Sequence, residues 1–307
     1  MPYNGIFDFV FLSNNEKTMT TKEDAYAYNL SGANEGFIAV FDGCGGLGSR
    51  KYPVAENRTG AFLASRAACS AVYSLYEEKG NAVDCACVKK AITERLVKLK
   101  EETDDGRPEL LGSMVKTFPT TMVLADMRKS AAGMKGRFVW AGDSRGYILD
   151  ADGLKQMTKD DITGDEDAFE NLYNDSPLSN LVHISGDFRL NEVSFEVKKP
   201  SIIMTATDGT FGYLPSPMHF ELLLLDTLMN SKNISEWENA LEMQFREISG
   251  DDATILMTGC MFMGSFKKLK DLFKKRFQYL KELLAPAASR EQLQSIWLNK
   301  YKPDYER

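Results

Sequence analysis

Residues 37–43, 138–144 and 201–209 read FIAVFDG, FVWAGDS and SIIMTATDG. Each stretch is an apolar run that ends on an aspartate, and a glycine or a serine directly follows that aspartate. A carboxylate at the end of a buried strand is costly in a protein core and rare by chance. Three such carboxylates in one chain therefore predict a shared site at the ends of buried strands.

Two acid pairs, Glu23-Asp24 and Asp251-Asp252, lie near the two ends of the same region. Like charges that converge cannot all stay ionised unless cations neutralise them. Mg²⁺ and Mn²⁺ prefer oxygen ligands, and two such ions about 3.5–4 Å apart can lower the pKa of a shared water molecule. The chain has only two histidines, and neither lies in a zinc-ligand spacing, which argues against a zinc hydrolase.

The composition is that of a globular protein of one or two domains, with 307 residues, 43% of them hydrophobic and 26% charged. A net charge of −7 argues against nucleic acid as a partner. The N-terminal MPYNGIFDF has no features of a secretory signal, and no run approaches the about 20 apolar residues of a transmembrane segment. The five scattered cysteines are typical of reduced thiols, so we expect a cytoplasmic protein.

The order of predicted elements favours layers rather than strict β-α alternation. Runs of strands are broken by pairs of helices, which suggests two sheets face to face with helices outside, a layered α+β fold. The predicted strands are 5–12, 25–30, 36–42, 119–126, 136–143, 145–149, 192–198, 201–207 and 253–260; the predicted helices are 54–78, 83–102, 217–230 and 235–247; residues 158–190 form a polar insertion with a short helix.

Residues 264–307 are predicted to form a basic, amphipathic helical extension that follows a body spanning residues 1–263. From residue 265 onward there are 11 Lys or Arg and 5 Asp or Glu, a charge of +6, which leaves −13 for the rest of the chain. Apolar residues recur at helical spacing from Phe266 to Leu284, with lysines between them. This helix either packs on its own acidic body, which the opposite charges favour, or binds a partner groove or an anionic membrane.

Five short segments in order resemble the metal-dependent serine/threonine phosphatases of the PPM (PP2C) family. The resemblance covers about residues 5–262, and each motif is weak by itself while the ordered set is specific. The segments are Lys22-Glu23-Asp24-Ala25, Val40-Phe41-Asp42-Gly43-Cys44-Gly45-Gly46, Ala141-Gly142-Asp143-Ser144-Arg145, Thr207-Asp208-Gly209-Thr210-Phe211 and Gly250-Asp251-Asp252-Ala253-Thr254.

The resemblance implies a four-layer αββα sandwich with two central, mostly antiparallel sheets, and a centre of two Mg²⁺ or Mn²⁺ ions between the sheets. By position, Asp42 would bridge both ions, the Gly43 carbonyl would bind one, and Asp208 and Asp251 would hold the other side. The remaining predicted ligands are Asp24, Glu23 through a water, and Asp143 for a weaker third ion.

Two positions depart from the family pattern. A histidine that protonates the leaving group is common after the Asp-Gly of the second motif, and here that position is Cys44. A thiol near metal ions could also act as a redox-sensitive brake. The phosphate-binding arginine expected five residues before Asp24 is replaced by Met19, so that Lys17 or Lys22 would have to supply the charge.

Several of these residues also have plain structural explanations. Asp143 and the Asp251-Asp252 pair suit tight turns, and Glu23 could equally be a solvated surface residue. Gly43 to Gly48 fits GxGxxG, but Asp42 places a negative charge where a dinucleotide site needs to bind pyrophosphate, and residues 59–76 contain no acid.

The sequence thus predicts a cytoplasmic hydrolase with a signalling role, a phosphatase that cleaves phosphoserine or phosphothreonine in phosphoproteins with a metal-bridging hydroxide. The alternatives are a catalytically weak phosphoprotein-binding scaffold of the same fold, suggested by Met19 and Cys44, and a phosphatase of a small phosphorylated metabolite.

Overall fold

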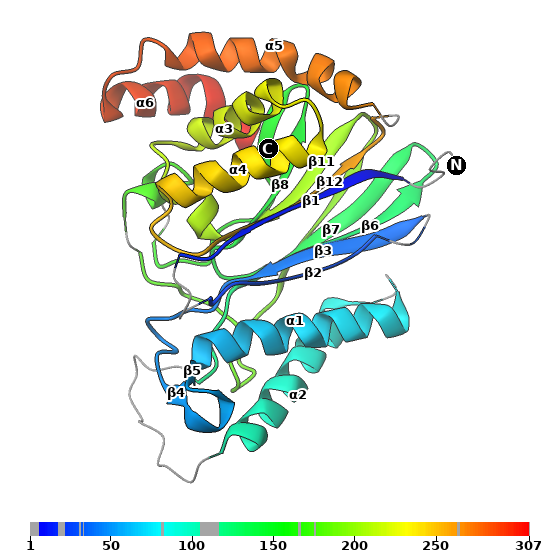
Figure 1. The fold of residues 1–307 in the computed structure, drawn as a ribbon, viewed down its shortest axis with the longest axis vertical. Coiled ribbons are helices and arrows are strands. Elements are labelled where there is room, and N and C mark those ends of the chain that lie inside the picture. Colours follow the sequence, from blue (N-terminus) through cyan, green and yellow to red (C-terminus); the bar gives the residue numbers. More distant parts are fainter. Residues whose placement is uncertain are drawn as a thin grey trace.

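Two five-stranded antiparallel sheets lie face to face at the centre of the molecule, and helices cover both outer faces (Figure 1). This computed structural model describes residues 6–17, 22–30, 32, 34–80, 83–104, 117–164, 167–174, 176–262 and 265–306. The first sheet has the order β1 (Phe7–Asn15), β12 (Ala253–Cys260), β11 (Ser201–Ala206), β8 (Arg145–Asp150) and β9 (Gly153–Gln156). The second has the order β10 (Asn191–Val197), β7 (Gly133–Ala141), β6 (Met122–Ser130), β3 (Glu35–Phe41) and β2 (Ala25–Asn29).

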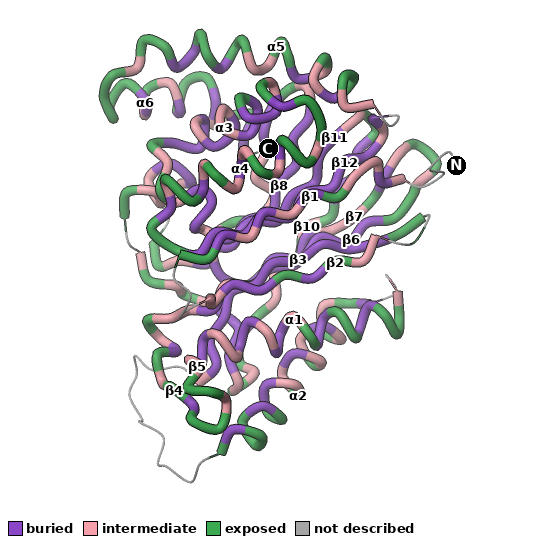
Figure 2. Tube along the Cα trace, viewed as in Figure 1, coloured by how far each residue is buried: buried purple, intermediate pink, exposed green. Residues whose placement is uncertain are grey.

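Side chains alternate along the central strands between two different cores. In β3, Phe37 and Phe41 face the helices, whereas Ile38 and Val40 face the opposite sheet. This period of two is the property of a strand buried on both faces, and it explains why the apolar runs are continuous. Figure 2 shows the resulting buried strands at the centre of both sheets.

The helices form the outer layers. α1 (Gly60–Lys79) and α2 (Cys85–Thr103) cover the second sheet, while α3 (Pro217–Asn230) and α4 (Ile234–Ile248) cover the first (Figure 1). The predicted αββα sandwich is therefore confirmed.

The first predicted helix starts later than the sequence pattern suggested. Residues 51–59 form a small hairpin of β4 (Lys51–Tyr52) and β5 (Arg58–Thr59) with a 3₁₀ turn between them, rather than the start of a helix at residue 54. Glu56 and Asn57 have left-handed backbones, with φ of 55° and 59°, which is incompatible with a continuous α-helix. The helix begins after Thr59, whose side chain caps it by accepting a hydrogen bond from the Phe62 N–H.

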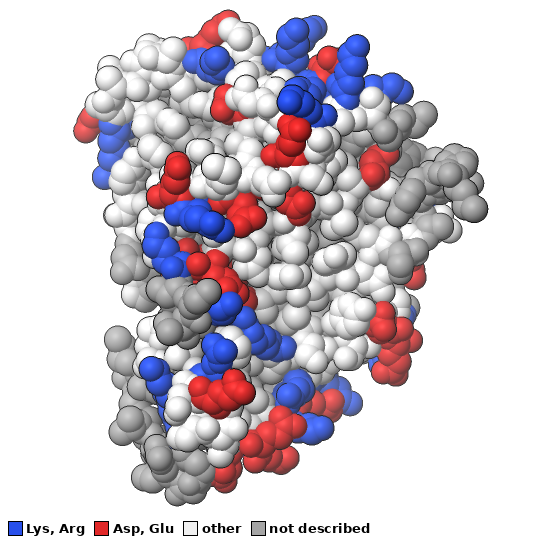
Figure 3. Space-filling view, viewed as in Figure 1, with Lys and Arg blue, Asp and Glu red and all other residues white. Residues whose placement is uncertain are grey.

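The C-terminal residues pack on the body rather than standing free. α5 (Phe266–Leu284) lies over α3, and its buried side chains Leu269, Phe273 and Leu280 join the core outside the first sheet. Its exposed face carries the lysines that line the upper edge of the molecule in Figure 3. α6 (Arg290–Ile296), the π-helical turn Trp297–Tyr301 and α7 (Lys302–Tyr305) then return toward the sheet. The division into a 1–263 body and a 264–307 extension stays a prediction, since the two share one core.

All five cysteines are free thiols, as the sequence analysis expected. Within the part of the chain that the structure describes, no helix is both long and apolar enough to cross a bilayer.

Candidate metal centre

The predicted acids lie where strands begin and end. Asp42 directly follows β3, Asp143 lies between β7 and β8, and Asp208 follows β11 after one residue. Asp24 directly precedes β2, and Asp251 lies just before β12. In an antiparallel sheet the end of one strand lies beside the start of its neighbour. The register thus places Asp24 near Asp42 in the second sheet and Asp208 near Asp251 in the first, and the hydrogen bond from Thr207 to Asp24 joins the two edges.

Two glycines permit this close approach of chain segments. A Cβ atom at Gly43 would lie 2.5 Å from the backbone oxygen of Ala61, and a Cβ atom at Gly209 would lie 1.9 Å from the backbone oxygen of Asp252. Real Cβ atoms do not approach backbone that closely, so neither position accepts a side chain without a shift. The glycine of each Asp-Gly motif is therefore required by packing beside the acid that it follows.

The electrostatics show that the acids share one environment. Burial, followed by the charges of Asp208, Asp24, Asp143 and Asp251, raises the pKa of Asp42 well above its usual range. Because the charges of all four acids affect the pKa of Asp42, the four acids lie around it. The prediction that the acids gather at one place, rather than on different faces of the molecule, is therefore supported.

The pKa values of the neighbouring acids rise for the same reason. Burial is the largest cause for Asp24 and Asp143, whose pKa values rise to about 8. It also raises the pKa of Asp208, with the charge of Asp251 adding to the effect. Ionising these groups together is unfavourable without positive charge nearby, which is the condition that a divalent cation relieves.

The side chains around Asp24 fit a hard cation. The Thr207 hydroxyl donates to Asp24 Oδ2 at 2.9 Å, whereas Asp24 Oδ1 is buried and has no hydrogen-bond partner among the described residues. A buried carboxylate oxygen without a partner is costly, and metal coordination is one way to satisfy it. The donor set consists of carboxylate oxygens, which Mg²⁺ and Mn²⁺ prefer. The residues present therefore fit these ions.

The carboxylates do not yet have the spacing of a formed metal site. Among the described residues, no group of three or more Asp, Glu, His or Cys is arranged to hold a metal ion. Asp42 and Asp208 instead share a side-chain hydrogen bond, which requires a proton on one of the two carboxyl groups. The roles of Asp42, Gly43, Asp208, Asp251 and the other acids as ligands stay predictions.

Glu23 lies against the glycine-rich turn that follows Asp42. Its Oε1 accepts a hydrogen bond of 2.6 Å from the Thr59 hydroxyl, and a Cβ atom at Gly45 would lie 2.2 Å from its Oε2. Burial raises the pKa of Glu23, and the hydrogen bond from Thr59 opposes this rise. Glu23 is therefore a half-buried member of the site and not a solvated surface residue.

Asp252 has a backbone-binding role that the sequence did not indicate. Its buried carboxylate accepts the N–H of Lys17 at 2.7 Å and the N–H of Glu23 at 2.6 Å. Residues 18–21, which include Met19, lie between these two anchors and outside the described residues. Because Asp252 is used in this way, the exposed Asp251 stays the predicted ligand of the pair.

Cys44 occupies a tight turn beside the acids. Its N–H donates to Pro119 O, and its carbonyl accepts from the N–H groups of Leu47 and Gly48. Burial, followed by the charge of Asp42, raises the pKa of the Cys44 thiol well above its usual range. A thiol that stays protonated is a poor nucleophile and reacts slowly with oxidants, so the metal-free surroundings of Cys44 do not favour a redox brake.

The lysines that were expected to replace the missing arginine have other partners. The Lys22 ammonium lies 2.5 Å from Glu16 Oε2, and the Lys17 ammonium donates to Ser249 O. Sequence reasoning missed Arg66 on α1, whose Nη1 lies 3.5 Å from the Glu23 carbonyl and whose guanidinium stacks on the Phe62 ring at 3.7 Å. No motif marks this arginine, because its proximity to Glu23 arises only when α1 packs on β2 and β3.

A second cation, Arg145, lies behind Asp143 and is fully committed to an ion pair. The guanidinium of Arg145 is buried and binds both oxygens of Asp160, with Nη2 2.6 Å from Oδ2 and Nε 3.0 Å from Oδ1. It also stacks on Phe211 at 4.2 Å. Asp143, Asp208, Arg145 and Asp160 line a cavity of about 200 Å³ at the surface of the site.

No family model matches the chain, but a known protein is similar to it in sequence. A protein of Mycoplasma genitalium named "Putative protein phosphatase" is 25% identical over 256 residues, which span 74% of this chain and 85% of that protein.

Solved structures of phosphatases share the fold. The serine/threonine phosphatase Stp1 of Staphylococcus aureus aligns with a TM-score of 0.61 and 16% identity over 81% of this chain and 93% of its own. The PPM Ser-Thr phosphatase MsPP of Mycobacterium smegmatis aligns with a TM-score of 0.56 and 14% identity over 82% and 98%. The catalytic domain of the phosphatase PstP, crystallised with two manganese ions, aligns with a TM-score of 0.53 and 16% identity over 82% and 97%. The chain thus has the fold of PPM phosphatases, which confirms the resemblance indicated by the motifs.

Proposed function

We propose that this chain is a cytoplasmic, Mg²⁺- or Mn²⁺-dependent phosphatase that removes phosphate from phosphoserine and phosphothreonine in proteins. The observation that supports it most directly is that Asp42, Asp208, Asp24 and Asp143 all lie at strand ends on one edge of the sandwich, where burial and neighbouring acids raise their pKa values. A phosphatase fold and a relative named as a phosphatase support the reaction class.

The chain's own residues would bind the cations and orient the ester. Asp42, the Gly43 carbonyl, Asp208 and Asp251 are the proposed ligands of two ions, with Asp24, Glu23 and Asp143 completing the set. When bound, such ions neutralise the carboxylates, orient the phosphoryl group and activate a water molecule for attack on phosphorus.

The walls around the acids determine how the substrate is received. Tyr213 and Phe211 line the cavity together with Asp208 and Asp143. Tyr213 is exposed, so its ring is available to contact a peptide that carries the phosphorylated side chain. Arg145 is neutralised by Asp160 and is therefore a support for Asp143 rather than a phosphate ligand.

The test is hydrolysis of phosphoserine and phosphothreonine peptides and of p-nitrophenyl phosphate, with Mn²⁺, with Mg²⁺ and with EDTA. We expect activity that requires a divalent cation and falls about 100-fold or more in Asp42→Asn and Asp208→Asn, because the ions supply several kcal/mol of transition-state stabilisation. Asp226→Asn, on the exposed face of α3, is the matched control and should keep full activity. Activity that survives EDTA and both substitutions would exclude the proposal.

A catalytically weak phosphoprotein-binding protein is the second candidate. It is favoured by Cys44 at the position expected to protonate the leaving group and by Met19 at the position expected to hold the phosphate-binding arginine. This candidate predicts Mn²⁺ binding and phosphopeptide binding without turnover at any metal concentration. A panel of small phosphorylated metabolites, assayed in parallel, separates the protein phosphatase from a metabolite phosphatase.

A further inference from the structure

One wall of the acid cavity is a loop from the polar insertion, residues 167–174, which we call the wall loop. Asn171, Leu172 and Asn174 of this loop line the same cavity of about 200 Å³ as Asp143 and Asp208. The shape of this cavity, and hence the space open to a phosphorylated side chain, depends on where the wall loop lies.

The wall loop is held by the C-terminal residues 290–306, which we call the tail. Asp167 Oδ2 accepts hydrogen bonds from Trp297 Nε1 at 3.0 Å and from the Lys302 ammonium at 2.7 Å. Its other oxygen, Oδ1, accepts the backbone N–H groups of Phe169 and Glu170, each at 3.0 Å. Asp167 thus fixes the turn of the wall loop with one oxygen and attaches it to the tail with the other.

A second set of contacts joins the same two segments. Glu170 accepts hydrogen bonds from Arg290 at 2.9 Å and from Gln294 Nε2 at 2.8 Å. The Phe169 ring, which is fully buried, stacks on Trp297 with the ring centroids 6.3 Å apart. The packing partner of the wall loop is therefore also part of the tail.

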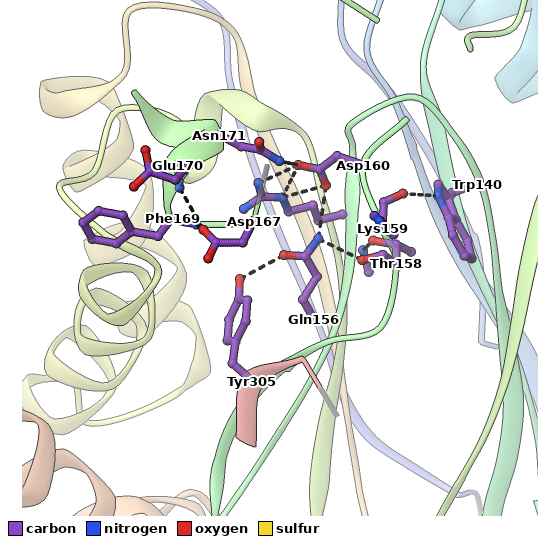
Figure 4. Close-up of polar contacts among 12 residues, drawn as sticks. Trp140, Gln156, Thr158, Lys159, Asp160, Asp167, Phe169, Glu170, Asn171 and Tyr305 are labelled. Atoms are coloured by element: carbon purple, nitrogen blue, oxygen red, sulfur yellow. Dashed lines mark hydrogen bonds and ion pairs between the residues drawn. The ribbon is translucent and has the colours of Figure 1, made fainter. Parts of the chain in front are cut away.

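The tail also reaches the ion pair behind Asp143. The Tyr305 hydroxyl donates to Gln156 Oε1 at 3.2 Å, and Gln156 Nε2 donates to Asp160 Oδ1 at 3.1 Å. Asp160 accepts a further hydrogen bond from Asn171 of the wall loop at 3.1 Å and forms the bidentate pair with Arg145. Figure 4 shows Gln156 between Tyr305 and Asp160, with Asn171 on the far side of Asp160.

A second cavity of about 680 Å³ adjoins the wall loop, and it shares Asp160 and Asn171 with the acid cavity. Lys302 of the tail and Trp140 of β7 form other parts of its lining. The second half of the loop is held by the body, through Asn171 on Asp160 at 3.1 Å and the Tyr173 hydroxyl on Pro215 O at 2.7 Å. The first half, Asp167 to Glu170, is held by the tail.

We propose that the tail is a positioning element of the site: it fixes the wall loop and the Arg145–Asp160 pair and so sets how tightly the substrate is held. This inference rests on the proposed phosphatase function. The wall loop lines the cavity but carries none of the proposed metal ligands. Loosening the tail should therefore weaken substrate binding more than it slows turnover.

The experiment compares full-length variants of the tail. Lys302→Met removes one donor to Asp167, and Trp297→Phe removes the other while keeping a ring against Phe169. Tyr301→Phe is the matched control, because the Tyr301 hydroxyl lies in the same tail but donates to Glu221 on α3, at 2.5 Å. Each variant is assayed for KM and kcat with p-nitrophenyl phosphate and Mn²⁺, and for amide hydrogen exchange of residues 167–174.

We expect Lys302→Met and Trp297→Phe to raise KM by about threefold to tenfold while kcat stays within about twofold of wild type. Both variants should speed amide exchange in the wall loop by about tenfold, which is the factor typical of losing a hydrogen bond to a charged group. Lys302→Arg should restore wild-type values of both. Tyr301→Phe should lower the unfolding midpoint without changing KM or exchange in the wall loop.

Three outcomes decide the matter. If the tail variants lose stability to the same extent as Tyr301→Phe while KM and loop exchange stay at wild-type values, the tail is only a structural support and the inference is wrong.

If wild-type protein hydrolyses no phosphate ester, the proposed function fails. The positioning role is then decided by amide exchange in the wall loop together with the affinity for Mn²⁺ alone, measured by calorimetry. Should Trp297→Phe fail to fold, Lys302→Met and Arg290→Met, which alter partly exposed side chains, test the same contacts.

Discussion

Arg66 is a half-buried guanidinium beside the backbone of Glu23, at the start of the acid-bearing region. Its Nη1 makes long hydrogen bonds of 3.2 to 3.5 Å to Ser65 Oγ and to the carbonyls of Phe62 and Glu23, and its plane lies over the Phe62 ring. Burial lowers the pKa of Arg66, while the charges of Asp24 and Glu16 oppose that change. Among the described residues, it is a cation with the planar donor geometry that suits a phosphoryl group.

We predict that Arg66→Met raises KM for p-nitrophenyl phosphate about tenfold, the cost of losing a charged hydrogen bond, and that Arg66→Lys recovers only part of the loss because an ammonium lacks the planar fork. The measurement is steady-state kinetics with saturating Mn²⁺. Arg95→Met, which removes an ion pair with Glu102 on the far helix α2, is the control and should not change KM. An unchanged KM in Arg66→Met would show that this arginine only supports the Glu23 backbone.

At the scale of single elements, the two Asp-Gly turns show how backbone packing and chemistry depend on each other. Gly209 lies in the middle of the 3₁₀ turn Asp208–Thr210 after β11 and directly against the backbone of Asp252, the residue before β12. Through this contact the turn that carries Asp208 is held against the turn that carries Asp251. A side chain at residue 209 would force these two turns apart.

Gly209→Ala is therefore expected to lower the free energy of unfolding by about 1–3 kcal/mol or more, as overpacking does, and to weaken Mn²⁺ binding. Gly46→Ala is the matched control: a Cβ atom there meets nothing within 4 Å, and the backbone at Gly46 is not left-handed. The control should stay within about 0.5 kcal/mol of wild type. Urea unfolding and calorimetric Mn²⁺ titration measure both quantities; equal effects of the two substitutions would contradict the packing argument.

At the scale of the whole molecule, the acid cluster lowers the stability of the metal-free protein and makes its stability depend on bound metal. Carboxylates whose pKa values are raised by burial and by mutual repulsion oppose folding when they are ionised without a counter-charge. A ligand that binds only the folded protein adds about 2.7 kcal/mol of stability at 100 times its Kd. Metal should therefore change the stability of this fold strongly.

We predict that saturating Mn²⁺ raises the thermal midpoint of the wild type and that EDTA reverses the rise. Asp42→Asn should unfold at a higher temperature than the wild type in EDTA, because a neutral amide replaces a carboxyl group whose ionisation is opposed by burial and by the neighbouring acids, and should gain little from Mn²⁺. Differential scanning calorimetry in both conditions gives the four midpoints. A wild-type midpoint that is the same with Mn²⁺ and EDTA would argue against a metal centre in these acids.

Much of this architecture could be predicted from the sequence because it has local signals. The apolar runs before Asp42 and Asp208 are continuous since both faces of β3 and β11 are buried, and their ends are marked by the Asp-Gly turns. The start of α1 was misplaced because left-handed residues at 56 and 57 leave no clear trace in hydrophobic periodicity. The predicted acids gather as expected, yet their role as ligands remains a prediction.

The remaining contacts depend on tertiary packing and carry no motif. Asp252 binds the backbone at Lys17 and Glu23, and Arg66 reaches Glu23 only because α1 packs on the second sheet. Likewise, Tyr305 meets Gln156 across half of the chain. Contacts of this kind depend on the topology of the whole fold, and no short stretch of the sequence indicates them.

The pairing of β1 with β12 has a consequence for how the chain is made. Phe7 lies opposite Cys260, so β1 cannot pair with its neighbour until synthesis has reached β12. The sheet of β2, β3, β6, β7 and β10 can assemble beforehand, since its last strand ends at Val197. During that interval β1 presents an unpaired edge, the kind of edge at which one chain can pair with another.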